Sequence, residues 1–369
     1  MSDLQNTITL LLKKAAELYQ KEFYTEALQT CEQAIRLNPL LASARTNRGI
    51  VLKKLGRYSE ALLAYDRSLM LNPSASGTHY NRGLVLQELD RWQDAVEAYN
   101  KAIQLDPEYV EAYSAIGVAL KHLGHYNEAA EAFKQALRRN PDLVNEQYYL
   151  ACLGNAETPS QAPDQYIIEL FDNYASSFDT ELVDKLEYRA PQQIYEAIHT
   201  YISDQFETLE ILDLGCGTGL CGVLVAKHAR QLVGIDLSQN MLAKARAREI
   251  YTDLIQSDLL ASLNNHQAKY DIIISADVFI YIGDLAEIFH KASRLLHTNG
   301  FFAFSIETTS KEVEYEINAT GRYSQSLKYI QKLADNNNLQ IIENQSVILR
   351  RQEYHPVEGA IIVMQKSPR

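Results

Sequence analysis

Residues 211–220 read Ile211-Leu-Asp-Leu-Gly-Cys-Gly-Thr-Gly-Leu220, a short apolar run followed by three glycines at alternate positions. The run is typical of a buried strand, and the glycines predict a turn at which a ligand lies against bare backbone. A helix expected from Gly219 presents its positive N-terminal end to the same ligand. A dinucleotide fingerprint needs a further glycine at the position of Leu220. We therefore predict a ligand site at a strand end that is not a dinucleotide site.

Short β-branched runs alternate with helical patterns on both sides of this turn. The predicted strands are Leu209–Leu214, Gln231–Ile235, Leu254–Ser257, Tyr270–Ala276, Gly300–Ile306, Leu339–Leu349 and Gly359–Met364. The predicted helices include Gly219–His228, Gln239–Arg248, Asp284–His297 and Tyr323–Ala334. Such alternation is typical of a doubly wound α/β sheet, which binds ligands at the carboxyl ends of its strands. Because no helix separates the last two strands, we expect them to pair as a hairpin and the final strand to be antiparallel.

Two more aspartates stand at predicted strand ends in the same half. Asp236 ends the second strand, where its carboxylate is expected to accept hydrogen bonds from both hydroxyls of a ribose. Asp258 ends the third strand, where it is expected to receive an adenine amino group. Together with Asp213 and the glycine turn, these signals resemble the class I methyltransferases that bind S-adenosyl-L-methionine.

Three neighbouring segments extend the resemblance: Phe171–Asp179, Leu182–Pro191 and Ser275–Asp284. With them, the sequence resembles a bacterial group of methyltransferases that carry N-terminal tetratricopeptide repeats. It implies a Rossmann-like fold, S-adenosyl-L-methionine as cofactor, S-adenosyl-L-homocysteine as product and an N-terminal helical lid. Arg189 is a candidate partner of the methionyl carboxylate, and Tyr188 a further contact. The alternative is a structural lid helix with solvent-facing charges. The implied cofactor-binding residues are Tyr174, Arg189, Asp213, Gly215, Cys216, Gly217, Asp236, Leu237, Met241, Ser257, Asp258, Leu259 and Ala276.

The first half of the chain repeats with a period of 34 residues. Asn-Pro or Asp-Pro follows an amphipathic helix pattern in each copy, with the prolines at Pro39, Pro73, Pro107 and Pro141. A small residue recurs where two helices must approach closely, at Ala15, Gly49, Gly83 and Gly117. This resembles the tetratricopeptide repeat, in four copies over about residues 8–143, with a capping helix near Val144–Leu153.

Such an α-helical solenoid implies a concave surface that takes a protein or peptide partner. Asn47 and Asn81 occupy equivalent positions one repeat apart, and Tyr80 lies beside Asn81. We expect the two asparagines to hydrogen-bond the backbone of an extended peptide. The alternative is that asparagine is simply common at that register of the repeat.

Residues 154–163 lack periodicity and are rich in proline, serine and glycine, which is typical of a boundary. We predict a repeat domain over 1–153, a linker over 154–163 and a methyltransferase domain over 164–369. Up to Glu157 the chain holds 17 basic and 19 acidic residues, and the remainder holds 18 and 28. The acidic second half argues against nucleic acid as the main substrate, because affinity for phosphate backbones comes from basic residues.

No apolar run is long enough to span a bilayer, and Met1–Leu12 lacks the basic segment of an export signal. The four cysteines show no metal-ligand spacing. We therefore expect a cytoplasmic protein that binds no metal and no membrane.

Methyl transfer from a sulfonium needs alignment of nucleophile, methyl and sulfur with water excluded, and a base only where the acceptor must lose a proton. Candidate bases are Asp277, Tyr281 and His355, and none of them stands out. A lone loop histidine is more often a surface residue. The segment after Ala276 lacks the N/D-P-P-Y element of many amino-group methyltransferases, which argues against DNA adenine or protein glutamine as the acceptor.

Arg322 with Tyr323, and the pair Arg350-Arg351, are candidates to hold an anionic substrate over the site, the alternative being solvated loop charges. Two functions remain open. One is an enzyme that methylates a peptide, a protein or a small molecule, with the repeats recruiting substrate or partner. The other is a binding scaffold whose second half holds the cofactor but transfers no methyl group.

Overall fold

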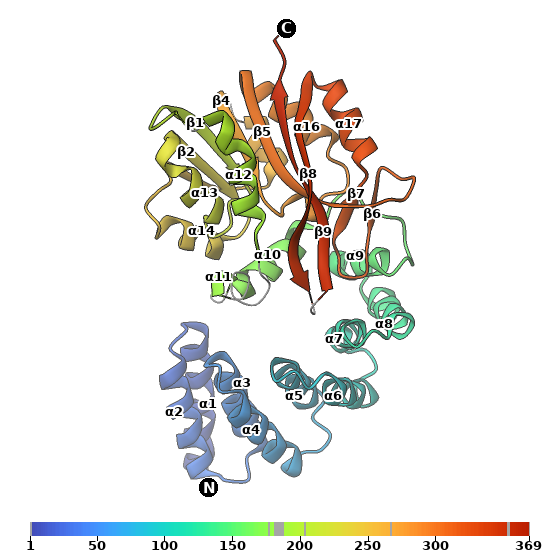
Figure 1. The fold of residues 1–369 in the computed structure, drawn as a ribbon. Coiled ribbons are helices and arrows are strands. Elements are labelled where there is room, and N and C mark those ends of the chain that lie inside the picture. Colours follow the sequence, from blue (N-terminus) through green and yellow to red (C-terminus); the bar gives the residue numbers. More distant parts are fainter. Residues whose placement is uncertain are drawn as a thin grey trace. The chain divides into compact units, whose positions relative to one another are not determined.

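The computed structural model describes residues 2–175, 178–180, 188–202, 204–265, 268–352 and 355–368. Their contacts divide the chain into two compact units, Met1–Asn155 and Ala156–Arg369. Figure 1 shows the first unit as a series of helices and the second as a sheet covered by helices. Within the described ranges, no helix has both the length and the apolar composition that crossing a bilayer requires.

The first unit consists of helices that pair consecutively along the chain. Within each pair the first helix packs on the second, and each pair packs on the next. The helices are α1 Ser2–Gln20, α2 Tyr24–Leu37, α3 Ala42–Lys54, α4 Tyr58–Leu71, α5 Ser76–Glu88, α6 Trp92–Leu105, α7 Val110–His122, α8 Tyr126–Arg139 and α9 Val144–Cys152.

A glycine and an aromatic ring interlock inside three of the four pairs. A Cβ atom on Gly83 in α5 would lie 2.4 Å from the ring of Tyr99 in α6. Gly49 faces Tyr65 at 2.5 Å, and Gly117 faces the corresponding ring of α8 at 2.4 Å. The small residues therefore recur because a ring occupies the place of their side chain. In the first pair the equivalent residues, Ala15 and Cys31, are both buried.

The Asn-Pro and Asp-Pro dipeptides end the second helix of each pair through a common turn. The side-chain oxygen of Asn38 accepts a hydrogen bond from the backbone N–H of Leu40, at 3.1 Å. The equivalent bonds recur from Asn72, Asp106 and Asn140, at 3.2–3.3 Å. Because proline disfavours helical backbone in the residue before it, the acceptor side chain and the proline end the helix together.

The second unit is built on one mixed sheet. Its central strands run parallel in the order β3-β2-β1-β4-β5, and β9 pairs antiparallel with both β5 and β8. The predicted α/β sheet with an antiparallel final strand is therefore confirmed. The strands are β1 Leu209–Leu214, β2 Ala229–Asp236, β3 Asp253–Gln256, β4 Tyr270–Ser275, β5 Leu296–Thr308, β6 Tyr315–Ile317, β7 Tyr323–Gln325, β8 Leu339–Gln352 and β9 His355–Lys366.

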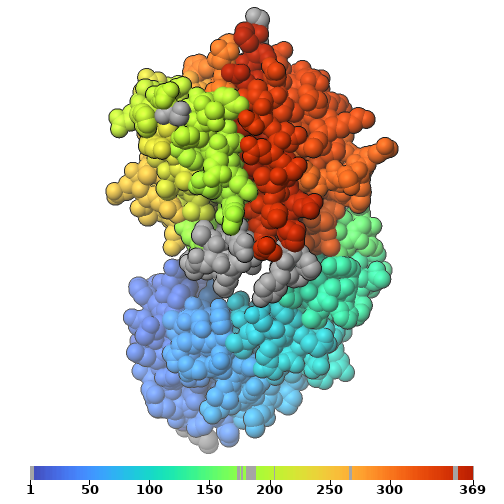
Figure 2. Space-filling model, viewed as in Figure 1, coloured from blue at the N-terminus to red at the C-terminus, as the bar shows by residue number. Residues whose placement is uncertain are grey.

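Successive residues of each strand enter two different cores. Ile211 packs with α12 and α13, whereas Leu212 packs with α16 and α17 on the opposite face. In the space-filling view, the yellow-green residues of α12 lie beside the red residues of β8 and β9 (Figure 2). The helices are α10 Asp164–Tyr174, α11 Phe178–Thr180, α12 Ala190–Ile202, α13 Leu220–Val225, α14 Gln239–Arg246, α15 Leu259–Asn265, α16 Ala286–Leu295 and α17 Leu327–Asn336.

Two details of the second unit differ from the sequence prediction. The predicted helix Tyr323–Ala334 is in fact a short strand, β7, followed by α17, whose N-cap Ser326 accepts a hydrogen bond from the N–H of Tyr329. The predicted linker 154–163 is partly structured. Pro159 accepts a hydrogen bond from the Tyr323 hydroxyl at 2.9 Å, and Ser160 accepts two from the loop after β4, so these residues belong to the second unit.

Candidate active site

A cavity of about 290 Å³ lies at the carboxyl ends of the parallel strands in the second unit. One part of its wall comes from the strand ends of β1, β2, β3 and β4, as the position of ligand sites in doubly wound sheets predicts. The predicted residues in this wall are Gly215, Gly217, Asp236, Leu237, Met241, Ser257, Asp258, Leu259 and Ala276. The structure thus brings most of the predicted cofactor residues together in one place.

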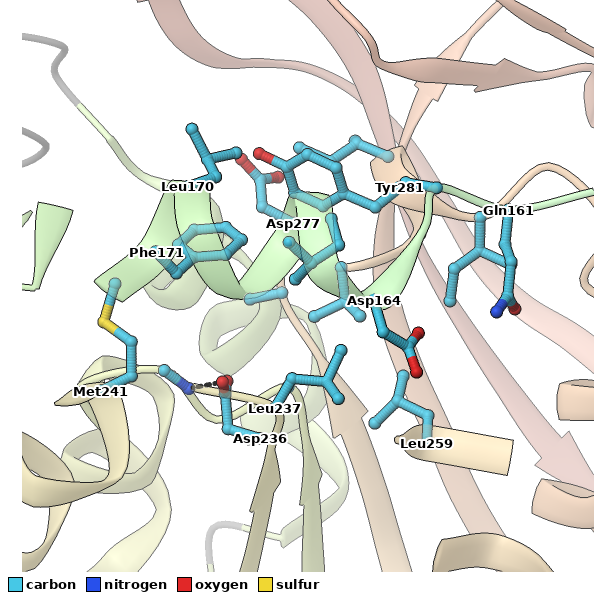
Figure 3. A pocket seen from close by; sticks show the side chains of 18 of the residues that line it. Gln161, Asp164, Leu170, Phe171, Asp236, Leu237, Met241, Leu259, Asp277 and Tyr281 are labelled. Carbon is cyan, nitrogen blue, oxygen red and sulfur yellow. Dashed lines mark hydrogen bonds between the residues drawn. The ribbon is translucent and has the colours of Figure 1, made fainter. Parts of the chain in front are cut away.

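The glycine turn and Asp236 are joined by hydrogen bonds. Gly215 and Gly217 have φ of +67° and +53°, which favours glycine, and a Cβ on Gly215 would lie 2.3 Å from Val278. One oxygen of Asp236 accepts the N–H of Gly217 at 2.8 Å, the contact drawn in Figure 3, and the other accepts the N–H of Ser238 at 2.9 Å. The turn is therefore held open towards the cavity.

Burial raises the pKa of Asp236, and the backbone hydrogen bonds from Ser238, Gly217 and Leu237 oppose that rise. A carboxylate offers about four acceptor positions, and these backbone bonds occupy only part of them. Asp236 can therefore still accept hydrogen bonds from a ligand's hydroxyl groups.

Asp213 lies beneath the turn and outside the cavity wall. It is 1% exposed, and its carboxylate accepts a hydrogen bond of 2.7 Å from the hydroxyl of Tyr251. The ring of Tyr251 fills the space beside Gly219 and Gly222, so it supports the turn from below. Burial raises the pKa of Asp213 to about 7, with the charge of Asp236 adding to the rise and the bond from Tyr251 opposing it. Cys216, also predicted as a cofactor contact, is buried in the same layer.

The raised pKa of Asp213 predicts a pH-dependent stability. The folded protein favours the neutral carboxyl, so this group's stabilising contribution is lost as the pH rises from about 4 through about 7. The variant Asp213→Asn should therefore gain stability relative to the parent, on the order of 2 kcal/mol between pH 5 and pH 8. Urea unfolding of both proteins without cofactor at the two pH values checks this. Parallel pH profiles would show that Asp213 is ionised in the folded protein.

Helix α10 covers the cavity and is tied down at both ends. At its start, Ala162 donates a hydrogen bond of 2.8 Å to the carbonyl of Tyr281, and Gln161 bridges to Ile282. Near its end, Asp172 accepts a 2.5 Å hydrogen bond from the hydroxyl of Ser238, the N-cap of α14. Figure 3 shows Leu170 and Phe171 of α10 facing the cavity, across from Asp236 and Leu237. Helix α10 thus covers the strand ends, whereas residues 176–177 and 181–187 of the segment expected to form the lid lie outside the described residues.

Beyond β4 the cavity meets a buried ionic cluster. Asp277, at φ +54°, accepts a hydrogen bond of 2.6 Å from the guanidinium of Arg350 and one of 3.1 Å from Ser305. The second arm of Arg350 bonds Glu307, and Arg350 is only 2% exposed. Two carboxylates thus surround one guanidinium. Arg350 is buried at the cavity wall and bonded to both of them, so the alternative of a solvated loop charge is wrong for this residue.

Tyr281 and Arg322 complete this side of the cavity. Burial raises the pKa of Tyr281, and Arg322, which hydrogen-bonds its hydroxyl, opposes that rise. The ring of Tyr281 stands edge-on to Phe171, with centroids 5.5 Å apart. Of the two residues predicted to hold an anionic substrate, Arg322 lines the cavity, whereas Tyr323 is fully buried and its hydroxyl donates a hydrogen bond to the carbonyl of Pro159.

The remaining predicted residues lie elsewhere. Arg189 is exposed and lines a separate hollow with Gln193 and Arg351, so its placement does not favour the expected bond to a methionyl carboxylate. Tyr188 does line the cavity. The side chains of Tyr174 and His355 lie outside the described part of the chain. In the first unit, Asn47, Tyr80 and Asn81 are half-buried on α3 and α5.

Sequence reasoning missed the lid residues of the cavity wall. Gln161, Asp164 and Ile167 reach the cavity from α10 and the segment before it. The signal that could have found them is the apolar spacing of α10, whose helical face includes Ile167, Leu170 and Phe171.

Residues 211–300 match the model of a methyltransferase domain family. The second unit contains a methyltransferase domain, matched over these residues. The first unit matches tetratricopeptide repeat models at residues 42–75, 88–124 and 110–143, which confirms the repeat assignment. In the methyltransferase domain, the match begins in β1 and ends in β5, so it contains the glycine turn and Asp236.

Two curated relatives are methyltransferases. A ubiquinone biosynthesis O-methyltransferase of Hydrogenovibrio crunogenus is 32% identical over 108 residues, which is 27% of this chain and 45% of that protein. A probable S-adenosylmethionine-dependent methyltransferase of Mycolicibacterium smegmatis is 27% identical over 111 residues, which is 30% of this chain and 43% of that protein. The chain spans about a quarter to just over half the length of the first curated relatives it matches.

One solved structure among those similar to the chain is magnesium protoporphyrin IX methyltransferase from Synechocystis with bound S-adenosylmethionine. It is 16% identical, has a TM-score of 0.40, and the match covers 57% of this chain and all of that one.

Proposed function

We propose that the chain is an S-adenosyl-L-methionine-dependent methyltransferase that acts on a peptide, a protein or a small molecule in the cytoplasm. The observation that carries this proposal is the hydrogen bond between Asp236 and the glycine turn at the cavity wall. Asp236 holds the N–H of Gly217 and keeps acceptor positions for ribose hydroxyls, while the turn offers bare backbone to the methionyl part. The methyltransferase family match over the same residues supports it.

The chamber beyond β4 is where the acceptor would meet the cofactor's methyl group. Its wall includes Asp277, Tyr281 and Arg322, beside the apolar face of α10. Both oxygens of Asp277 already accept hydrogen bonds, one from Arg350 and one from Ser305. We infer that alignment under the lid, with water excluded, supplies most of the acceleration.

The alternative is a scaffold that binds the cofactor without transferring its methyl group. The test is calorimetric titration of the full chain with S-adenosylmethionine, followed by incubation with labelled cofactor and extract from cells that lack this chain. The enzyme should bind the cofactor and label an acceptor. Binding without any labelled acceptor would favour the scaffold, and absence of binding would exclude both.

The repeat domain is proposed to recruit a protein or peptide. Its half-buried Asn47 and Asn81 lie at equivalent places on α3 and α5. Tyr80, the residue before Asn81, has its ring 5.0 Å from that of Tyr109. The spacing of one repeat suits two successive contacts to an extended backbone.

The double variant Asn47→Ala/Asn81→Ala should capture its partner about tenfold more weakly, since each lost hydrogen bond contributes about 0.5–1.5 kcal/mol. Affinity capture from extract, quantified by mass spectrometry, measures this, and cofactor titration should give the parent's affinity. Asn145→Ala, a change in the closing helix α9, serves as the matched control. Equal capture by the double variant and the parent would remove the asparagines from the binding surface.

A further inference from the structure

Asp164 is an acidic residue of the cavity to which the fold gives no structural partner. It is the first residue of α10, follows Pro163, and its carboxylate stands at the cavity rim beside Leu259 in Figure 3. Within the described ranges of the chain, neither of its oxygens accepts a hydrogen bond. A carboxylate that faces a cavity without a partner is free to bond a ligand.

The position of Asp164 is set by backbone contacts just before it. Ser160 accepts hydrogen bonds from the N–H groups of Gly283 and Asp284, at 2.8 and 2.9 Å, and Ala162 donates one of 2.8 Å to Tyr281. These bonds tie the start of the lid to the loop after β4. Asp164, although exposed, therefore projects from an anchored point of the lid.

Asp258 lines the same cavity, directly before Leu259, whose side chain lies beside Asp164 in Figure 3. One of its oxygens accepts the N–H of Ala261 at 2.9 Å, in the first turn of α15. Burial raises the pKa of Asp164, and the nearby charge of Asp258 adds to that rise. Two like charges close together are unfavourable unless a donor lies between them.

An exocyclic amino group supplies two N–H donors and no acceptor in its plane, which suits two facing carboxylates. We propose that Asp164 and Asp258 together hold the 6-amino group of the cofactor's adenine, one N–H each, so that the lid helix selects an aminopurine. The inference rests on the proposed function and names the lid as the source of base selectivity. A ligand with a carbonyl at that place would set its oxygen against both carboxylates and leave them without donors.

A purely structural role for Asp164 has a different signature. An acidic residue in the first turn stabilises a helix through the helix dipole, whatever base the ligand carries. Removing such a residue would weaken every ligand that the lid covers by the same factor. Selectivity between two bases therefore separates the two roles.

The experiment is calorimetric titration of the full chain with S-adenosylhomocysteine and with its deaminated analogue, S-inosylhomocysteine. The parent should prefer the adenosyl ligand by roughly 100-fold or more, because a site built for an N–H group rejects an analogue that lacks it. In Asp164→Asn the preference should fall at least about tenfold, since the new amide can donate to the carbonyl of hypoxanthine. Glu169→Gln, an exposed acid of the same helix, is the control and should keep the parent's preference.

Each ratio is measured within one variant, so a partly unfolded preparation does not change it. If the parent binds S-adenosylhomocysteine and Asp164→Asn keeps its preference, the inference is wrong while the proposed function stands. If the parent binds neither ligand, the cofactor assignment itself is wrong, and the inference fails with it.

Discussion

Replacement of Arg350 by methionine is expected to lower the free energy of unfolding of the methyltransferase domain by about 3–5 kcal/mol. Arg350 is 2% exposed and its two arms bond Asp277 and Glu307. Methionine matches much of the side-chain volume but leaves two carboxylates without their cation in a buried setting. The cost comes from those uncompensated charges rather than from the lost ion pairs themselves.

Arg351 provides a matched control, because it is the next residue of β8 and is exposed. Arg351→Met should stay within about 0.5 kcal/mol of the parent. Adding Glu307→Gln to Arg350→Met should restore part of the loss, since one stranded charge is then removed.

Chemical unfolding followed by circular dichroism reports both units, whereas fluorescence of the single tryptophan, Trp92, reports the repeats alone. In Arg350→Met, the unfolding transition of the second unit, seen by circular dichroism, should shift. The transition of the repeats, seen by tryptophan fluorescence, should not. Equal stability of Arg350→Met and Arg351→Met would contradict the buried cluster.

The variant Asp236→Ala should weaken binding of S-adenosylmethionine by about 1.5–3 kcal/mol, the cost of losing hydrogen bonds to a charged group. Two effects add here, because the carboxylate would no longer reach the ligand's ribose and the N–H of Gly217 would lose its acceptor. Asp236→Asn should be intermediate, since its one carbonyl oxygen replaces only part of the acceptor capacity.

Calorimetry measures the affinities, and Asp253→Ala, an exposed aspartate at the start of β3, is the control that should bind as the parent does. Unchanged affinity in Asp236→Ala would mean that the ligand does not sit at the end of β2.

The parts of the fold that could be predicted depend on local patterns. The period of 34 residues and the register of Gly49 and Gly83 identify the helix pairs, because each close approach occurs within one repeat. The glycine turn and Asp236 were predictable because strand ends gather at one edge of a parallel sheet. What could not be predicted depends on distant contacts.

Two adjacent arginines illustrate that limit. Arg350 and Arg351 are equivalent in the sequence, but neighbouring strand residues point to opposite faces, and only the register of β8 against β9 decides which one is buried. Likewise Tyr323 was predicted to hold substrate because it follows Arg322. It is buried, and its hydroxyl donates to the carbonyl of Pro159, which is 164 residues away in the chain.

The interlocked glycines and rings also have a consequence for how the repeat domain can change length. Gly49 and Tyr65 belong to one helix pair, and Gly83 and Tyr99 to the next, so each hole is filled by a ring from its own repeat. Duplication or loss of a whole 34-residue segment would therefore carry every ring along with its hole. Recombination at the Asn-Pro boundaries can lengthen or shorten the array without creating a clash at these contacts, which makes the repeat the natural unit of insertion and deletion.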